Sequence, residues 1–198
     1  MRPRVPTRNL ERMTARVYSC IYSSPVGPIE LVESDGALSH VRLLGSSAAD
    51  DSPSRPGSTS ASSTTTDTTT ADSTTTGYAN TPLLRRTQKQ LAEYFAGRRR
   101  AFDLPLAAHG TPFQRSVWNE LATIPFGATS TYGSIARAVG QPQAARAVGG
   151  AIGANPLALV IPCHRVLAGD RRLTGFSGGD GVPTKVALLT LEGCEFRS

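Results

Sequence analysis

The sequence of 198 residues has few cysteines and no long apolar run. Its three cysteines are too few and too scattered for a disulfide scaffold or a four-ligand zinc site, so we expect no metal and a reducing, intracellular compartment. That compartment would be the cytoplasm of a bacterium or the nucleus of a eukaryote. No stretch approaches the roughly 18 apolar residues of a membrane span, which excludes an integral membrane protein.

Acidic residues are also in the minority, with 15 Asp and Glu against 21 Lys and Arg, giving a formal net charge of +6. Residues 78–198 carry fourteen basic and seven acidic side chains, whereas residues 1–77 carry seven and eight. The excess positive charge therefore gathers in the C-terminal part. A basic surface is a precondition for binding a polyanion such as nucleic acid, but a solvated surface without such a partner has the same composition.

The N-terminal part, residues 13–106, is typical of a small domain built on an antiparallel sheet. Residues 1–12 before it are polar and rich in arginine, and we expect them to be a disordered extension, with Met13 as the alternative start. Asp35-Gly36 predicts a tight hairpin turn between two strands. Alternating, β-prone residues predict three strands in all, at 16–22, 29–33 and 37–44.

A segment of unusual composition, residues 46–77, interrupts this domain. Of its 32 residues, 19 are Ser or Thr and none is a large apolar residue. Such a segment cannot bury enough surface to offset its ordering entropy, so we predict a disordered insertion. A regulatory tether that is phosphorylated is the alternative.

The C-terminal part, residues 107–198, is predicted to be a second and mainly helical domain. The spacing of apolar residues predicts one helix in the N-terminal part, from Thr81 to Gly97. In the C-terminal part it predicts four helices, at 112–124, 132–139, 143–152 and 183–191. The second and third of these four, joined by a short turn, have the pattern of a helix-turn-helix.

The helix at 143–152 has almost no side-chain bulk. Its small residues, and those that follow it, are Ala144, Ala145, Ala147, Gly149, Gly150, Ala151 and Gly153. Arg146 is its one long side chain. Because each Gly in a helix costs roughly 1 kcal/mol relative to Ala, several together need a reason. Close packing against another helix and close approach to a large partner, such as a groove of DNA, explain it equally well.

Residues 161–166 carry the strongest chemical signal. A cysteine is a nucleophile only as the thiolate, and His164 and Arg165 beside Cys163 are able to supply a base and a positive neighbourhood. Because adjacent side chains of an extended segment point in opposite directions, His164 would act through a water or a bend. A buried cysteine beside a surface histidine is the alternative. Glu192 is either a surface charge or an inward carboxylate that orients His164.

Four motifs follow one another between residues 111 and 193. They are Tyr132-Gly133, Ala145-Arg146-Ala147-Val148-Gly149-Gly150-Ala151, Asn155-Pro156 and Ile161-Pro162-Cys163-His164-Arg165-Val166. In these motifs the sequence resembles the methylated-DNA–protein-cysteine methyltransferases, which are 6-O-alkylguanine-DNA alkyltransferases. The resemblance implies an α+β fold. Its small N-terminal α/β domain would have an antiparallel, ribonuclease H-like sheet, and its mainly helical, winged-helix-like C-terminal domain would carry a DNA-binding helix-turn-helix.

The resemblance implies direct DNA repair in a single turnover. The protein would bind double-stranded DNA, flip out a 6-O-alkylguanine and accept its alkyl group irreversibly on Cys163, with 4-O-methylthymine as a further candidate substrate. It would work as a monomer, without cofactor, metal or membrane. One alternative is a non-catalytic protein that binds alkylguanine and recruits repair factors, against which Cys163 argues. Another is a thiol hydrolase, which leaves Arg146 unexplained.

The resemblance also assigns roles to matching positions. His164 would take the proton of Cys163 through a bridging water and be oriented by Glu192. Tyr132 would donate a proton to guanine N3, and Asn155 would brace the turn after the recognition helix. The predicted catalytic residues are thus Cys163, His164, Glu192, Tyr132 and Asn155. The predicted substrate pocket consists of Tyr132, Cys163, Val166, Phe176 and Ser177, and Phe176 stands where many members have tyrosine.

In such a protein the Gly/Ala-rich helix enters the minor groove, which admits only small side chains, and Arg146 fills the gap left by the flipped base. The predicted DNA contacts are Arg146, Ala145, Ala147, Gly149, Gly150, Arg165 and Thr131. Two segments depart from the family pattern. Residues 180–184 make the loop after Ser177 longer than in the shortest members, and the insertion at 46–77 has no counterpart.

Overall fold

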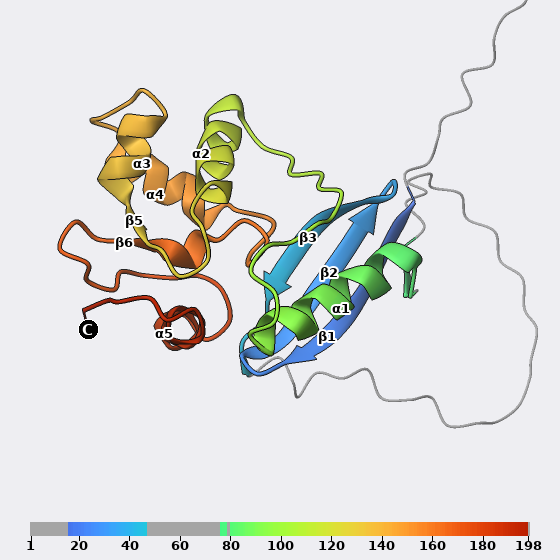
Figure 1. Cartoon of the computed structure of the whole chain (residues 1–198). Helices are drawn as coiled ribbons and strands as arrows, with labels where there is room; N and C mark the ends of the chain where they lie inside the picture. The colour runs from blue at the N-terminus through green and yellow to red at the C-terminus, as the bar shows by residue number, and fades with distance from the viewer. Residues whose placement is uncertain (1–15, 47–75, 79, 198) are drawn as a thin grey trace, which may run out of the picture.

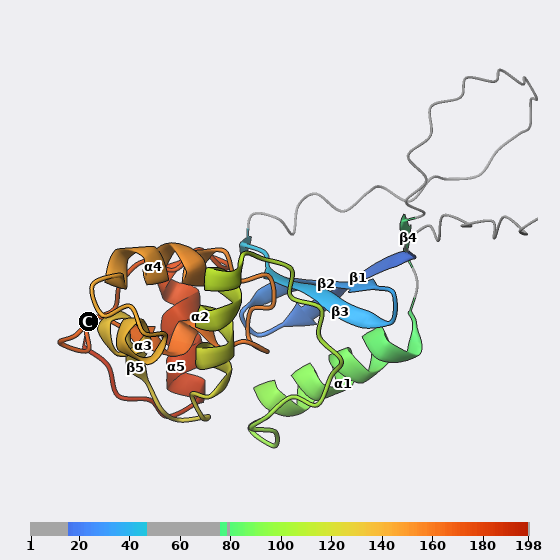
Figure 2. The same ribbon diagram turned by 90° about the horizontal axis from the view of Figure 1, so that it is seen from above.

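The computed structural model describes residues 16–46, 76–78 and 80–197. The predicted extension at 1–12 and all but the ends of the predicted insertion at 46–77 lie outside these residues. The described chain forms a part built on a sheet and a mainly helical part, which lie side by side (Figures 1 and 2). The prediction of an α+β fold with a helical C-terminal part is confirmed.

Three antiparallel strands form the first part, namely β1 (Val17–Ser24), β2 (Gly27–Ser34) and β3 (Ala37–Leu43). The turn between β2 and β3 needs two residues with positive φ, and Asp35 (50°) and Gly36 (80°) provide them. Alternation buries Ile29 and Leu31 on the face that α1 (Pro82–Phe95) covers (Figure 1). Thr81 caps this helix by accepting a hydrogen bond from the backbone N–H of Leu84 at 3.1 Å.

A fourth short strand, β4 (Thr76–Tyr78), pairs in parallel with β1. It was not predicted, because the sequence around it has no alternating apolar pattern. At the other end of the predicted insertion, the backbone N–H and the hydroxyl of Ser46 both donate to Asp180, at 2.7 and 3.0 Å. Both ends of the insertion are therefore tied to the described fold.

The second part consists of four helices, α2 (Pro112–Ala122), α3 (Tyr132–Ala138), α4 (Ala145–Gly153) and α5 (Val182–Leu191), with the two-residue strands β5 (Ser130–Thr131) and β6 (Val166–Leu167). Thr111 and Gln114 cap α2 reciprocally, at 2.9 and 3.2 Å. From the buried side of α2, the indole N–H of Trp118 donates to the carbonyl of Ala151 at 2.8 Å, which fixes α4 against the core. The preceding helix α2 thus holds the helix-turn-helix of α3 and α4 in place.

The apolar composition of residues 157–161 predicts a buried strand or extended segment, and in the structure this segment is buried but turns back on itself. The N–H of Ile161 donates to the carbonyl of Leu157 at 2.8 Å, and Leu159 has a φ of 70°. The free edge of β3 holds this segment, because Val41 donates to Pro156 at 2.8 Å and accepts from Ala158 at 3.1 Å. Backbone hydrogen bonds therefore join the two parts directly beside Cys163. Among the described helices, none combines the length and the apolar composition that crossing a bilayer requires.

Candidate active site

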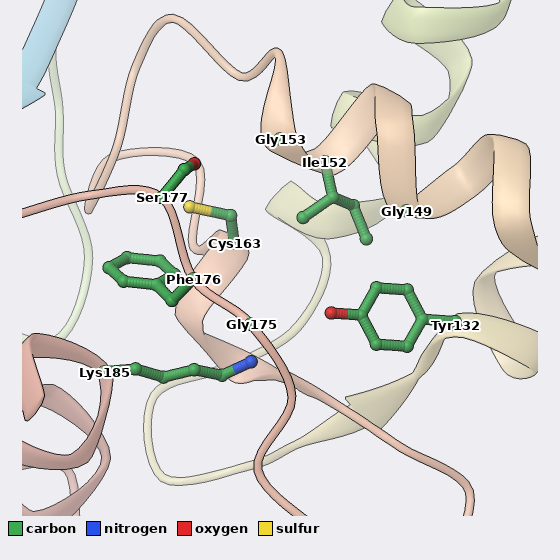
Figure 3. A pocket seen from close by; sticks show the side chains of 9 residues that line it. All are labelled: Tyr132, Gly149, Ile152, Gly153, Cys163, Gly175, Phe176, Ser177 and Lys185. Atoms are coloured by element: carbon green, nitrogen blue, oxygen red, sulfur yellow. The ribbon is translucent and has the colours of Figure 1, made fainter. Parts of the chain in front are cut away.

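Cys163 opens a short 3-10 turn (Cys163–Arg165) and lies on the wall of a cavity of about 310 Å³. α3, α4, α5 and the loop after Leu173 supply the other walls (Figure 3). These residues are Tyr132, Gly149, Ile152, Gly153, Gly175, Phe176, Ser177 and Lys185. A cavity of this size beside a cysteine suits a small flat molecule with one reactive substituent.

Two polar groups point into this cavity from opposite sides, the hydroxyl of Tyr132 and the ammonium of Lys185 (Figure 3). The Tyr132 hydroxyl lies 3.0 Å from the hydroxyl oxygen of Thr174, so either atom is able to donate. The Lys185 side chain is only 1% exposed, and its Nζ donates to the carbonyl of Val166 at 2.6 Å. The cavity therefore offers a hydroxyl group and an amino group near the thiol.

The 3-10 turn places His164 behind Cys163, facing the end of α5. Nε2 of His164 lies 2.9 Å from Oε1 of Glu192, and both side chains are fully buried. Glu192 is the C-cap residue of α5, so the helix end aims its carboxylate inward. The bend at 163–165 thus replaces the extended geometry in which the two side chains would have pointed apart.

Glu192 is ionised in this setting. Burial alone would raise the pKa of the carboxyl, but hydrogen bonds from His164 and Arg165 outweigh it and hold the pKa at about 2. Since an ionised carboxylate only accepts hydrogen bonds, Nε2 of His164 carries the proton and Nδ1 keeps its lone pair. Within the described part of the chain, that Nδ1 is buried and has no hydrogen-bond partner.

The thiol and the imidazole are both neutral at rest. Burial raises the pKa of Cys163, although the Asn155 side chain and the charge of Lys185 oppose the shift. Burial also lowers the pKa of His164, against the attraction of Glu192. A neutral imidazole is able to accept a proton, and Glu192 is placed to stabilise the charge that results. The arrangement is therefore that of a nucleophile held as a thiol beside an oriented base.

The structure corrects the assignment of Arg165 as a DNA contact. This residue is 6% exposed, and its guanidinium donates to Glu192 through Nε at 2.7 Å and through Nη2 at 2.8 Å. A third bond runs from Nη1 to the carbonyl of Ile124 at 2.6 Å. Because its donors are committed inside the protein, Arg165 holds Glu192 in place and does not face a partner.

Asn155 and Thr131 both make local hydrogen bonds. Asn155 donates to the carbonyl of Ile161 at 2.8 Å and accepts from the N–H of Leu157 at 3.1 Å, so it spans the chain between α4 and Cys163. Thr131 caps α3 by accepting from the N–H of Ser134 at 3.1 Å. Of the predicted pocket residues, Phe176 and Ser177 line the cavity, whereas Val166, expected to take part through its carbonyl, is fully buried and this carbonyl accepts from Lys185.

α4 has one buried and one exposed face. Val148, Ala151 and Ile152 pack into the core. Arg146, Ala147, Gly150 and Gly153 form the exposed face, while Ala145 and Gly149 lie at its border. The exposed face adjoins the mouth of the cavity, since Gly149 and Gly153 also line the cavity wall.

Two residues of the site were missed from the sequence. Lys185 stands as a lone basic residue in the apolar helix α5, which was an available signal. Tyr94 is one of the apolar residues whose spacing predicts the helix from Thr81 to Gly97, yet its hydroxyl donates to Oε1 of Glu192 at 2.6 Å. Nothing local marks that contact, because its partners lie 98 positions apart. In the parts of the chain that the structure covers, no three His, Cys, Asp or Glu side chains group as metal ligands.

Comparison with known proteins identifies both parts of the chain. A family model described as the DNA binding domain of 6-O-methylguanine DNA methyltransferase matches residues 112–194. A second, described as the ribonuclease-like domain of the same protein, matches residues 17–108.

Named relatives agree with these matches. A methylated-DNA–protein-cysteine methyltransferase of Methanosarcina acetivorans is 38% identical over 177 residues, which cover 89% of this chain and 99% of that protein. The constitutive methylated-DNA–protein-cysteine methyltransferase of Bacillus subtilis is 45% identical over 122 residues, which cover 62% of this chain and 73% of that protein. The crystal structure of Mycobacterium tuberculosis O6-methylguanine methyltransferase is 36% identical with a TM-score of 0.69, covering 89% of this chain and 93% of its own. That of Mycobacterium tuberculosis OGT in complex with DNA is 36% identical with a TM-score of 0.68, covering 90% and 92%. The chain therefore belongs to the 6-O-methylguanine DNA methyltransferase family.

Proposed function

We propose that this protein repairs DNA directly, by moving the alkyl group of a 6-O-alkylguanine onto Sγ of Cys163. The observation that carries the proposal is the placement of Cys163 between a cavity for a small flat molecule and the buried pair of His164 and Glu192. The relatives named methylated-DNA–protein-cysteine methyltransferase, and the mycobacterial structure in complex with DNA, support the same reaction and the same partner.

The proposed step balances as a single displacement. His164 takes the proton of Cys163 at Nδ1 through a water molecule, while Glu192 stabilises the imidazolium that forms. The thiolate attacks the alkyl carbon, a carbon–sulfur bond forms, and the bond from that carbon to O6 breaks. The electron pair stays with guanine, and the Tyr132 hydroxyl protonates N3. Because the thioether is stable, each molecule reacts once.

DNA would reach the site through α4. The exposed face of this helix has little bulk, so it suits the narrow minor groove, and Arg146 is the long side chain available to fill the gap left by a flipped base. A base leaving the duplex there would enter the cavity that Gly149, Gly153 and Tyr132 line. Unstacking costs a few kcal/mol and less for a poorly paired base, which favours the damaged nucleotide.

Duplex DNA with a labelled 6-O-methylguanine tests the proposal. We expect the peptide that contains Cys163 to gain the mass of one methyl group, with one transfer per protein molecule. Cys163→Ala should lose transfer and keep DNA binding, because an alanine at this buried position leaves the face of α4 intact. Tight binding without transfer would instead indicate a recruiting protein. DNA-independent turnover of an ester or thioester would indicate a thiol hydrolase.

A further inference from the structure

The first part of the molecule contributes a side chain to the buried relay of the second. Tyr94 lies in the last turn of α1, and its hydroxyl donates to Oε1 of Glu192 at 2.6 Å. Both residues are buried, at 1% and 5% exposed. The helix that covers the sheet therefore reaches the carboxylate that faces His164.

The contact falls on the oxygen that matters for His164. Oε1 of Glu192 accepts from Nε2 of His164 at 2.9 Å, from Nη2 of Arg165 at 2.8 Å and from Tyr94, whereas Oε2 accepts from Nε of Arg165. A carboxylate oxygen with three donors is fixed in direction and shares its charge among them. Each donor that is removed leaves more of that charge to the others.

Aromatic packing holds the Tyr94 hydroxyl where it is. The rings of Phe95, Phe102 and Phe126 surround the ring of Tyr94, with centroids 5.2, 5.6 and 6.1 Å away. Phe126 belongs to the second part, so the cluster spans both. Burial, followed by the nearby charge of Glu192, raises the pKa of Tyr94, which therefore stays a neutral donor.

We propose that Tyr94 is a positioning residue of the alkyl-transfer reaction, through which the N-terminal part orients Glu192 and limits the negative charge that Glu192 presents to His164. The inference rests on the proposed function, since it concerns the base of that reaction. It assigns the N-terminal part a role in the chemistry in addition to its structural contacts.

The consequence is a shift in pH dependence. Glu192, Arg165 and Lys185 are the charged groups that influence His164, and Cys194 is the further titratable group beside Glu192. Only neutral His164 takes the proton of Cys163. Without the Tyr94 hydroxyl, Glu192 attracts protonated His164 more strongly, so the imidazole stays charged to higher pH. The acid limb of the profile of transfer rate against pH should therefore move to higher pH. A less well oriented carboxylate should also lower the plateau of the transfer rate.

The test compares Tyr94→Phe with Tyr22→Phe in the full chain, by single-turnover transfer of a labelled methyl group from duplex DNA across pH. Tyr22 is a matched control, because it stacks on Phe95 at 6.5 Å and loses the same hydroxyl away from Glu192. We expect Tyr94→Phe to lower the plateau about tenfold and to move the acid limb up by about half a pH unit, with unchanged DNA affinity. Tyr22→Phe should match the unaltered protein in both.

A Tyr94→Phe profile that coincides with that of the unaltered protein would overturn the inference and leave the proposed function standing. Loss of methyl transfer by the unaltered protein would overturn the proposed function itself. A double-mutant cycle adds a second measurement, in which Glu192→Gln is compared with the variant that carries both Glu192→Gln and Tyr94→Phe, because the neutral amide removes the charge that Tyr94 shares. These two should give the same pH profile. A further shift in the double variant would refute a role through Glu192.

Discussion

At the scale of single residues, Glu192 is the point on which the polar contacts of the site converge. A buried carboxylate is costly unless its oxygens are satisfied, and here Tyr94, His164 and Arg165 supply all four hydrogen bonds. Removing one of these donors leaves the buried charge partly unpaired. This destabilises a protein more than replacing the whole buried polar group by apolar residues of similar volume. The chemistry of Cys163 and the stability of the fold therefore depend on the same carboxylate.

This coupling predicts that acid destabilises the protein before ordinary surface carboxylates titrate. Burial lowers the pKa of His164 below its usual 6.5, so the unfolded chain binds a proton that the folded chain refuses, and stability falls as pH drops below about 6.5. Glu192, with a folded pKa of about 2 against a usual 4.5, adds a further loss as pH falls from about 4.5 toward 2. Both shifts have the same sign.

Urea unfolding between about pH 8 and about pH 5 measures this loss, to which His164 adds a slope of up to about 1.4 kcal/mol per pH unit, beside a contribution of the same sign from His40, whose pKa burial also lowers. His164→Gln keeps a donor for Glu192 and should flatten this slope. His109→Gln, at an exposed position, serves as the control and should not. A slope that His164→Gln leaves unchanged would show that other groups cause the acid loss.

Residue roles were predictable where a local motif carried them. Cys163, His164 and Tyr132 stand in such motifs, and the structure places them around one cavity or directly behind it. Arg165 was predicted to contact DNA because the sequence shows its charge but does not show that Glu192 is its buried partner. Tyr94 is the converse case, since an apolar pattern explains its ring but says nothing of a hydroxyl that meets a residue far along the chain.

At the scale of elements, the glycines of α4 lower the stability of this helix and leave its exposed face without bulky side chains. Among the described residues, no atom beyond the chain neighbours and the backbone of α4 itself lies within 4 Å of a Cβ added at Gly150 or at Gly153. Close packing within the protein therefore does not explain these two glycines, which was one of the two explanations the sequence left open. Gly149 differs, since its added Cβ would lie 3.8 Å from the Tyr132 ring, an ordinary contact.

Gly150→Leu should separate folding from DNA binding. The side chain would enter open space on an exposed helix, and Leu is a better helix former by roughly 1 kcal/mol, so the melting temperature should hold or rise. The same side chain would project from the face proposed for the minor groove, and affinity for duplex DNA should fall about tenfold or more. Fluorescence anisotropy and thermal melts measure both, with Ala92→Leu on the exposed side of α1 as the control. Unchanged affinity would remove α4 from the DNA interface.

Elements with a cap or a turn residue at their ends were predicted closely. The predicted helix starts at 112 and 132 and the predicted helix end at Gly97 agree with the structure, because the caps Thr111 and Thr131 and the positive φ of Gly97 are local requirements. The segment at 157–161 was predicted less well. Its burial follows from composition, but its turn depends on Asn155 and on the edge of β3, which no local pattern shows.

At the scale of the whole molecule, one site draws on both parts. α1 supplies Tyr94 to the relay, and β3 holds the loop that carries Phe176 and Ser177, since the carbonyl of Leu43 accepts from Gly179 at 2.9 Å. The basic side chains of the second part differ in their exposure to solvent. Arg146 is exposed on α4, whereas Arg165 and Lys185 are buried at the site. Salt should therefore act on two functions of the protein to different degrees.

DNA affinity should depend steeply on salt, while the chemical step should not. Contacts between exposed basic side chains and phosphates release counterions, so affinity should fall about tenfold or more between about 50 and about 200 mM salt. The pair of His164 and Glu192 is fully buried, and mobile ions screen such pairs weakly. Anisotropy titrations and single-turnover transfer at saturating DNA, over the same salt series, measure the two separately. A transfer rate that falls in parallel with affinity would mean that the reacting groups are open to solvent in the complex, contrary to the buried relay.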